Sequence, residues 1–195
     1  MARTDVRRAA FIDRDGVINE ELDYVHRVED FHLLPGVVDG LRLLADNGFA
    51  LVVVTNQAGI AKGYYTEHDF QQLTGHMRAT LADHGVELAA VYHCPHHPAG
   101  VVAGLAIECD CRKPRPGMLL QAAAELDLDL TRSVMVGDKP SDTQAGRSAG
   151  VAATVLVESG HALPPDALAH ADHACADLLA AARWICDPAV LPRFR

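Results

Sequence analysis

The chain has 195 residues, of which 49% are hydrophobic and 22% charged, and its formal net charge is -9 at pH 7. This composition is typical of a globular protein, and the acidic balance argues against nucleic acid or an anionic membrane as the main partner, because both select basic surfaces. We therefore expect one domain over residues 1–195. Only four apolar residues stand together before Asp13, too few for a signal sequence or a membrane span, so a cytoplasmic location is expected.

The first predicted element is a buried strand over residues 9–12, and it ends at an Asp-Arg-Asp-Gly segment. Side chains two positions apart lie on the same side of an extended segment, so Asp13 and Asp15 can face one reacting group. A plain turn is the alternative interpretation, since Asp and Gly are common turn residues. The polar connection over residues 20–32 is unusually long, and we expect it to flank the mouth of a site.

Helices and strands alternate along the rest of the chain. Apolar periodicity and capping residues predict helices over residues 37–48, 66–85, 118–128, 143–149 and 176–185, and apolar runs predict strands over residues 49–54, 88–93, 133–136 and 151–157. Such alternation favours a doubly wound, Rossmann-like α/β fold with a parallel sheet, in which ligands bind at the carboxyl ends of the strands. The last segment, residues 187–195, is expected to fray.

Polar residues at three predicted strand ends indicate a shared chemistry. Asp13, Thr55 and Asp138 each follow a strand, and Lys113 precedes a helix. This set is what phosphoryl transfer through an aspartyl-phosphate requires: Asp13 attacks phosphorus, and Asp15 protonates the leaving oxygen and later takes a proton from water. Asp13 and Asp138 would hold Mg²⁺, because carboxylates crowded near a phosphate need a hard cation. Lys113 and the Thr55 hydroxyl would bind the phosphoryl oxygens.

A second cluster of candidate ligands combines thiols with an imidazole. Cys94 begins a Cys-x-His pair, and Cys109 and Cys111 form a Cys-x-Cys pair. Three thiolates and one imidazole complete a tetrahedral set that suits structural zinc, although sulfur-rich tetrahedral sites also accept iron. Both His96 and His97 are candidates for the imidazole.

The expected role of this ion is structural. The loop that contains the cluster, about residues 94–111, has no regular period and no apolar core of its own. A bound ion would order the loop and fix Arg112 and Lys113, which directly follow the last thiol.

The motifs carry a resemblance to known proteins. The segments that begin at Asp13 and Thr55, Lys113, and the Gly-Asp-Lys-Pro-Ser-Asp segment around Asp138 resemble the four ordered motifs of the haloacid dehalogenase-like phosphohydrolases. Together with the Cys and His pairs, residues 9–157 are similar to the D,D-heptose 1,7-bisphosphate phosphatases and the related histidinol-phosphatase domains.

The resemblance implies a function and its cofactors. The reaction would be hydrolysis of the 7-phosphate of D-glycero-D-manno-heptose 1,7-bisphosphate, a step toward nucleotide-activated heptose for lipopolysaccharide or other glycans. It also implies a small phosphorylated substrate, catalytic Mg²⁺, structural Zn²⁺, a cytoplasmic monomer, and no cap beyond the zinc-binding loop.

The resemblance also implies a role for each matching residue. Asp13 would be the nucleophile and Asp15 the acid/base, with Asp15 joining Asp13 and Asp138 around Mg²⁺ through its backbone carbonyl. The zinc ligands would be Cys94, His96, Cys109 and Cys111. Substrate-binding residues would be Glu21, Leu22, Asp23, Tyr24, Asn56, Gln57, Ala58, Arg112 and Lys139, with Arg112 recognising the distal part of the substrate.

Two residues near these motifs stay open. Asp142 either positions Lys113 or metal-bound water, or is an ordinary acid at a helix N-terminus. His161 is expected to be a surface residue.

Other functions compete with this hypothesis. Histidinol phosphate or another small sugar phosphate could be the substrate, although the absence of a second catalytic domain after residue 185 favours the heptose. A phosphotransferase would need a second acceptor pocket. A zinc-stabilised binding module without activity would retain ligand binding when Asp13 is replaced by Asn.

Overall fold

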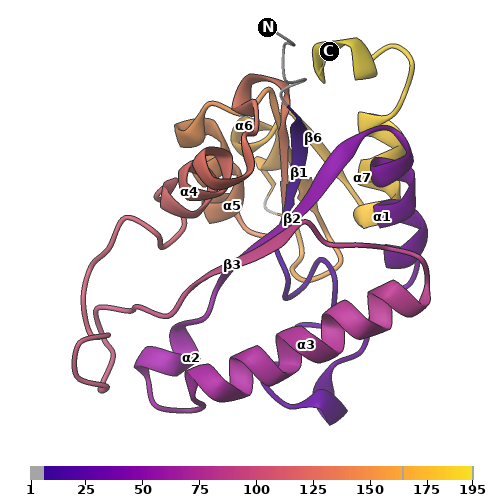
Figure 1. The fold of residues 1–195 in the computed structure, drawn as a ribbon. Helices are drawn as coiled ribbons and strands as arrows, with labels where there is room; N and C mark the ends of the chain where they lie inside the picture. Colours follow the sequence, from indigo (N-terminus) through magenta and orange to yellow (C-terminus); the bar gives the residue numbers. More distant parts are fainter. Residues whose placement is uncertain (1–6, 164, 195) are drawn as a thin grey trace, which may run out of the picture.

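A six-stranded parallel sheet forms the centre of the computed structural model, which describes residues 7–163 and 165–194 (Figure 1). The strands are β1 (Arg8–Ile12), β2 (Phe49–Asn56), β3 (Ala90–Cys94), β4 (Val134–Gly137), β5 (Ala153–Val157) and β6 (His173–Cys175). Their order is β3-β2-β1-β4-β5-β6, with every neighbouring pair parallel. The order reverses between β1 and β4, which is where doubly wound sheets bind ligands.

Helices cover both faces of the sheet, which explains why the strands β1, β2, β4 and β5 are almost entirely buried (Figure 1). The longer helices are α1 (Val37–Asp46), α3 (Glu67–Asp83), α4 (Gly117–Leu126), α5 (Pro140–Ala149) and α7 (Leu178–Ile185). Side chains of α1, α3 and α7 belong to one apolar cluster with the sheet, and those of α4 and α5 to another. Among the described residues, none of the helices has the length and apolarity needed to cross a bilayer.

Helix α3 shows how a local signal sets an element. Thr66 and Asp69 form the capping box expected there: the Asp69 N–H donates to the Thr66 hydroxyl at 3.2 Å, and the Thr66 N–H donates to the Asp69 carboxylate at 2.8 Å. Phe70, Leu73 and Met77 then follow at helical spacing and are buried. The cap and the apolar face together fix where the helix begins and which side packs inward.

The structure differs from the sequence-based expectation in its short elements. The sequence did not indicate strand β6, helix α2 (Ala58–Ala61), helix α6 (Ala167–His170), or the 3₁₀ helices η1 (Val28–Asp30) and η2 (Leu130–Arg132). The expected fraying of residues 187–195 is wrong as far as residue 194. A 3₁₀ helix, η3 (Leu191–Phe194), buries Phe194 completely, with its ring 5.5 Å from that of Phe49.

Candidate active site and thiolate cluster

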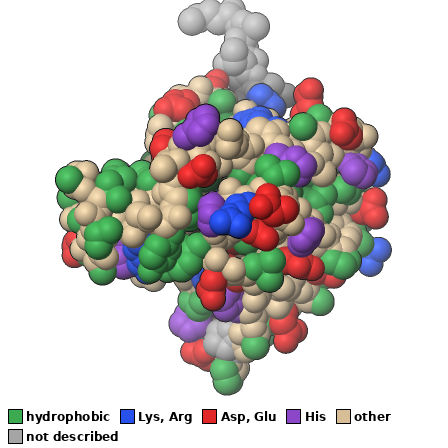
Figure 2. All heavy atoms as spheres, turned by 90° about the horizontal axis from the view of Figure 1, so that it is seen from below, with side chains coloured by type: hydrophobic (Ala, Val, Ile, Leu, Met, Phe, Trp, Pro, Cys, Tyr) green, Lys and Arg blue, Asp and Glu red, His purple; other side chains and the backbone are tan. Residues whose placement is uncertain are grey.

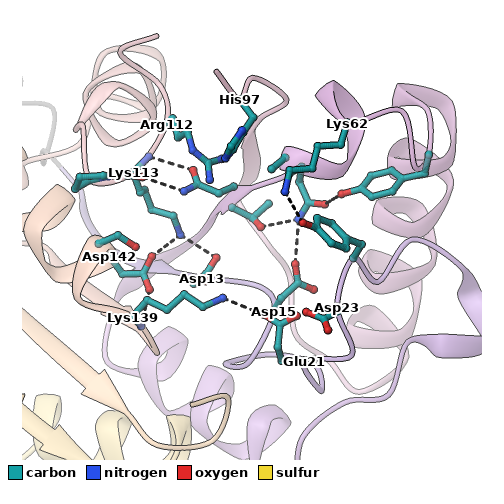
Figure 3. A pocket seen from close by; sticks show the side chains of 18 residues that line it. Asp13, Asp15, Glu21, Asp23, Lys62, His97, Arg112, Lys113, Lys139 and Asp142 are labelled. Atoms are coloured by element: carbon teal, nitrogen blue, oxygen red, sulfur yellow. Dashed lines mark hydrogen bonds and ion pairs between the residues drawn. The ribbon is translucent and has the colours of Figure 1, made fainter. Parts of the chain in front are cut away.

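A cavity of about 480 Å³ opens beside the carboxyl ends of the central strands. Seen from below, acidic, basic and histidine side chains gather near the middle of the molecule (Figure 2). The residues that line the cavity are Asp13, Asp15, Glu21, Asp23, Tyr24, Thr55, Asn56, Gln57, Ala58, Lys62, Tyr65, His97, Arg112, Lys113, Pro114, Lys139, Ser141 and Asp142 (Figure 3). The topology thus brings together the expected strand-end residues Asp13 and Thr55 with Lys113, although they lie far apart in the sequence.

Lys113 is the cation at the floor of the cavity. Its ammonium nitrogen lies 2.8 Å from a carboxylate oxygen of Asp13 and 2.7 Å from one of Asp142 (Figure 3). It also donates a hydrogen bond to the Val54 carbonyl at 2.7 Å. The residue is only 3% exposed. A buried ammonium whose three N–H groups meet three acceptors is held at one point, and a phosphoryl oxygen can bind it by replacing one of these acceptors.

Asp142 has both of the functions that the sequence left open. One carboxylate oxygen faces Lys113, and the other accepts the backbone N–H of Lys139 at 3.0 Å, at the start of α5. The same side chain therefore begins a helix and orients the cation of the site.

Asp13, Asp138 and Asp142 form an acidic group that fits a hard cation. Each offers a carboxylate oxygen, and these oxygens lie within 4.8 Å of one another. One oxygen of Asp138, Oδ1, is buried and has no hydrogen-bond partner among the described residues. Buried polar atoms without partners are rare, so this oxygen indicates a ligand position. Gly16 packs against the same carboxylate: its φ is +84°, and a Cβ there would collide with the other oxygen, Oδ2.

Burial controls the ionisation of this group. It raises the pKa of Asp13 to about 7, although the neighbouring Lys113 acts in the opposite direction. Burial likewise raises the pKa of Asp138, against the effect of Lys139. Burial alone would lower the pKa of Lys113, but the Asp13 and Asp142 carboxylates outweigh it and raise that pKa. A divalent cation would therefore displace protons when it binds here.

The Asp15 carboxylate is held by several donors. Arg14 donates to both of its oxygens, Asn19 donates to Oδ1 at 3.0 Å, and the Gln57 amide donates to Oδ2 at 3.1 Å. The same Gln57 amide donates to the Thr55 hydroxyl at 2.8 Å. Asp15 thus lies in the cavity wall with its orientation set by its neighbours.

The residues expected to bind substrate occupy different positions. Glu21 forms an ion pair of 3.0 Å with Lys139, and both residues line the cavity. Asn56 donates to the Lys113 carbonyl at 3.0 Å and accepts its N–H at 3.1 Å, so its side chain holds the backbone of the lysine. Leu22 is 52% exposed and is not among the residues that line the cavity.

Asp23, Tyr24, Ala58 and Arg112 complete the expected set, and all four line the cavity. Asp23 and Tyr24 have positive φ values of 51° and 60°. Such values are uncommon outside glycine, and they mark this part of the 20–32 connection as shaped by its contacts.

Several residues of the site were missed by the sequence analysis. Lys62 and Tyr65 line the cavity, and Lys62 donates to the Tyr24 hydroxyl at 2.7 Å. His161, expected at the surface, lies with Nδ1 2.5 Å from the Asp138 carboxylate while its side chain stays 45% exposed. The only available signal was proximity in sequence: Lys62 and Tyr65 follow the polar end of β2, and His161 follows the end of β5.

The predicted thiolate cluster assembles as expected. The Sγ atoms of Cys94, Cys109 and Cys111 lie 3.2–3.4 Å apart, and His96 Nδ1 is 3.3 Å from Cys111 Sγ. All four ligand atoms lie within 4.8 Å of one another, close enough to share one tetrahedral ion. His97 does not join this cluster, because it lines the cavity instead.

The cluster is joined to the active-site cavity by short contacts. Arg112 donates to the His96 carbonyl at 3.4 Å, and the backbone N–H of Gly117 donates to the Asp110 carbonyl at 2.9 Å. Arg112 directly follows Cys111, so its side chain lies beside the cluster as well as in the cavity wall.

The fold and the arrangement of the site define a haloacid dehalogenase-like hydrolase, and residues 110–182 match a family model described as HAD-hydrolase-like. Over 164 residues the chain is 51% identical to the D-glycero-beta-D-manno-heptose-1,7-bisphosphate 7-phosphatase of Escherichia coli (strain K12). The matched region makes up 84% of this chain and 86% of that protein. The chain belongs to the family of D-glycero-D-manno-heptose-1,7-bisphosphate 7-phosphatases. The resemblance seen in the motifs and the predicted fold class are thereby confirmed.

Two further relatives show the range of this family. A D-glycero-alpha-D-manno-heptose-1,7-bisphosphate 7-phosphatase of Photorhabdus laumondii is 46% identical over 154 residues, or 79% of this chain and 84% of that protein. The crystal structure of a D,D-heptose 1,7-bisphosphate phosphatase from B. bronchiseptica, complexed with magnesium and phosphate, is 33% identical, with a TM-score of 0.77 over 90% of this chain and 96% of that one.

Proposed function

We propose that this protein removes the 7-phosphate of D-glycero-D-manno-heptose 1,7-bisphosphate and leaves heptose 1-phosphate. The observation that carries the proposal is the buried Asp13 carboxylate beside Lys113, at the point where the strand order reverses. Family membership supports the choice of substrate, since the similar proteins act on heptose bisphosphates. The product keeps its anomeric phosphate, on which a nucleotidyl transfer can act toward an activated heptose for lipopolysaccharide or another glycan.

The proposed reaction has two displacements at phosphorus. A carboxylate oxygen of Asp13 attacks, the bond to the sugar oxygen breaks, and that oxygen takes a proton from Asp15. Water then attacks the aspartyl-phosphate and gives a proton to Asp15, and the bond to Asp13 breaks. Lys113 and the Thr55 hydroxyl bind phosphoryl oxygens in both steps, where the negative charge is spread.

The acidic group suits Mg²⁺ in this proposal. Asp13 and Asp138 would hold the ion together with the backbone carbonyl of Asp15, and the partnerless Asp138 Oδ1 supports that position. Bound there, Mg²⁺ would neutralise charge between the carboxylates and the phosphate. The magnesium in the B. bronchiseptica relative is consistent with this choice of ion.

The thiolate cluster suits Zn²⁺. Cys94, His96, Cys109 and Cys111 would fill all four tetrahedral positions, so no position remains for a reacting water and the ion would be structural. Its effect on catalysis would be indirect, through the backbone that carries Arg112 and Lys113.

The mouth of the cavity offers cations for the second phosphate. The cations Lys62 and Arg112 line it together with His97 (Figure 3). Burial lowers the pKa of His97, and the charges of Arg112 and Lys62 lower it further, so both cations lie near this imidazole. A local group of positive charge on a chain with a net charge of -9 favours a bound anion. We assign the distal 1-phosphate to it.

The experiment is a comparison of phosphate release, with Mg²⁺, from both anomers of heptose 1,7-bisphosphate, histidinol phosphate and fructose 1,6-bisphosphate. We expect a heptose anomer to lead in kcat/KM by about tenfold or more, equal to about 1.4 kcal/mol of discrimination. A lead for histidinol phosphate would move the substrate assignment. Wild-type rates in Asp13→Asn would overturn the mechanism, and no activity with any substrate would favour a binding module.

A further inference from the structure

Arg14 has the largest of the fully buried side chains in the described chain, at 1% exposure, although it lies between the two reacting aspartates. Its guanidinium turns back onto the next residue. Nη2 lies 2.8 Å and 2.9 Å from the two carboxylate oxygens of Asp15, and Nε donates to Oδ1 at 3.0 Å. A buried guanidinium is costly unless it is paired, and among the described residues its ion-pair partner is Asp15.

Three separate segments hold the guanidinium in place. Nη2 donates to the Val25 carbonyl at 2.8 Å, in the connection over residues 20–32, and the group stands 5.8 Å from the centre of the Phe70 ring on α3. The Gln57 amide oxygen, after β2, accepts from Nη2 at 3.5 Å. Because these contacts come from different parts of the fold, Arg14 cannot turn without disturbing all of them.

We propose that Arg14 is a positioning residue: it aims the Asp15 carboxyl group at the leaving oxygen and at the attacking water. This inference rests on the proposed Asp13-dependent phosphatase chemistry, but not on which sugar is the substrate. A planar guanidinium that grips both oxygens fixes the plane of the carboxyl group, which a single lysine amine cannot do. Asn19 donates a further hydrogen bond to one oxygen, Oδ1, and Gln57 donates one to the other, Oδ2.

The two chemical steps depend on Asp15 in different ways, and this makes the role testable. In the first step, the bond from phosphorus to the leaving oxygen breaks and an alkoxide must receive a proton from Asp15. A nitrophenolate leaves without that proton. In the second step, the proton of the attacking water goes to Asp15 whatever the original substrate was. A misdirected Asp15 should therefore slow the first step only for alkyl substrates.

The experiment measures kcat/KM of Arg14→Lys and Arg14→Gln with sugar phosphates and with p-nitrophenyl phosphate. Because kcat/KM reports the steps up to leaving-group departure, we expect a loss of about 10²-fold for sugar phosphates and less than about threefold for p-nitrophenyl phosphate. With p-nitrophenyl phosphate, kcat of the variants should fall because the second step is slowed. The first turnover should then appear as a burst of nitrophenolate. Asn19→Ser should show the same pattern with smaller losses, and it provides a second route if the Arg14 variants do not fold.

Asp15→Asn provides the reference, and the combined Arg14→Lys, Asp15→Asn variant should be no slower than Asp15→Asn alone. Arg78→Lys is a matched control, since Arg78 donates to the Leu88 carbonyl outside the cavity. Thermal unfolding confirms that each variant is folded. Equal losses for alkyl and aryl substrates, or additive losses in the combined variant, would overturn the role of Arg14 alone. Absence of Asp13-dependent activity in the wild type would overturn it together with the proposed function.

Discussion

Lys113 and Asp142 form an ion pair of 2.7 Å in which both side chains are 1% exposed, and the same lysine meets Asp13 at 2.8 Å. A residue at the start of a helix thereby holds the cation that faces Asp13, the proposed nucleophile. The pair is available for a direct test, because Asp142 can be changed without altering either Asp13 or Lys113.

Replacing Asp142 by Asn should impair both stability and catalysis. The amide can still accept the helix N–H, but it removes the negative partner of a buried ammonium, so we expect a loss of about 1.5–3 kcal/mol in the free energy of unfolding. We also expect kcat to fall by about tenfold or more, since Lys113 then loses one of the three acceptors that hold it. Urea denaturation and steady-state kinetics measure the two effects. Asp39→Asn, which removes an exposed pair with Arg42, should change neither; an unchanged kcat in Asp142→Asn would refute the positioning role.

Magnesium should stabilise the protein more strongly as the pH rises. Burial raises the pKa of Asp13 to about 7 and that of Asp138 above its ordinary value, so the metal-free fold binds protons that the unfolded chain has released. These groups favour the metal-free fold below their unfolded pKa, and that contribution is lost as the pH rises through the folded pKa. Because Mg²⁺ must displace the protons, its affinity should rise about tenfold per pH unit for each proton displaced, up to about pH 7.

Isothermal titration of Mg²⁺ at several pH values, together with the rise in melting temperature that it causes, measures this linkage. In Asp13→Asn one of the titrating groups is absent, so the dependence of Mg²⁺ affinity on pH should become shallower. Equal Mg²⁺ affinities at about pH 5.5 and pH 7.5 in the wild type would contradict the assignment of the ion to these carboxylates.

Removing zinc should unfold the loop around the thiolate cluster and weaken catalysis through Arg112 and Lys113. A chelator, or Cys109→Ser, should release one zinc ion per chain and lower the melting temperature. At free zinc about 100 times its dissociation constant, the lost stabilisation is about 2.7 kcal/mol. Metal analysis and thermal unfolding measure the result.

Cys175→Ser is the matched control for the zinc test, since Cys175 is also a free thiol but lies outside the cluster. It should keep the metal and the melting temperature of the wild type. If iron is found in place of zinc, the structural role stands and the ion is reassigned.

Lys62 should matter for bisphosphates and not for monophosphates. If it binds the distal phosphate, Lys62→Gln removes one charge-assisted hydrogen bond of about 1.5–3 kcal/mol, so KM for heptose 1,7-bisphosphate should rise by about tenfold or more. For p-nitrophenyl phosphate, which has no second phosphate, KM should stay within about twofold. Tyr24→Phe removes the hydroxyl that Lys62 contacts and separates its effect from that of the charge. Equal changes in KM for both substrates would rule out a distal site at Lys62.

The order of the elements and the ends of the strands could be predicted from the sequence. Asp13, Thr55 and Asp138 follow apolar runs, and in a parallel sheet all such runs end at the same edge, so their convergence needs no detailed packing. The thiolate cluster was also predictable, because its ligands come as two close pairs that a short loop brings together. Both predictions rest on local signals, namely the residue that follows an apolar run and two ligands placed two positions apart.

Tertiary structure alone decided how side chains use their polar groups. Asn56 and Gln57, which were expected to bind substrate, line the cavity, and their amides also hold the Lys113 backbone and the Asp15 carboxylate. In the sequence, Arg14 is simply the residue between two motif positions, and only the structure shows that it is buried. Such assignments depend on which donors and acceptors meet after burial, and partners more than forty positions away leave no periodic trace in the sequence.

The same limit applies to the segment near the C-terminus. Phe194 is one aromatic residue in a short terminal segment, and only its contact with Phe49 on β2 makes it part of the core. Sequence alone determined the architecture and the candidate reacting residues, because these follow from strand direction and residue chemistry. The tertiary structure decided the supporting contacts and the shape of the cavity, because burial creates these contacts between segments distant in the chain.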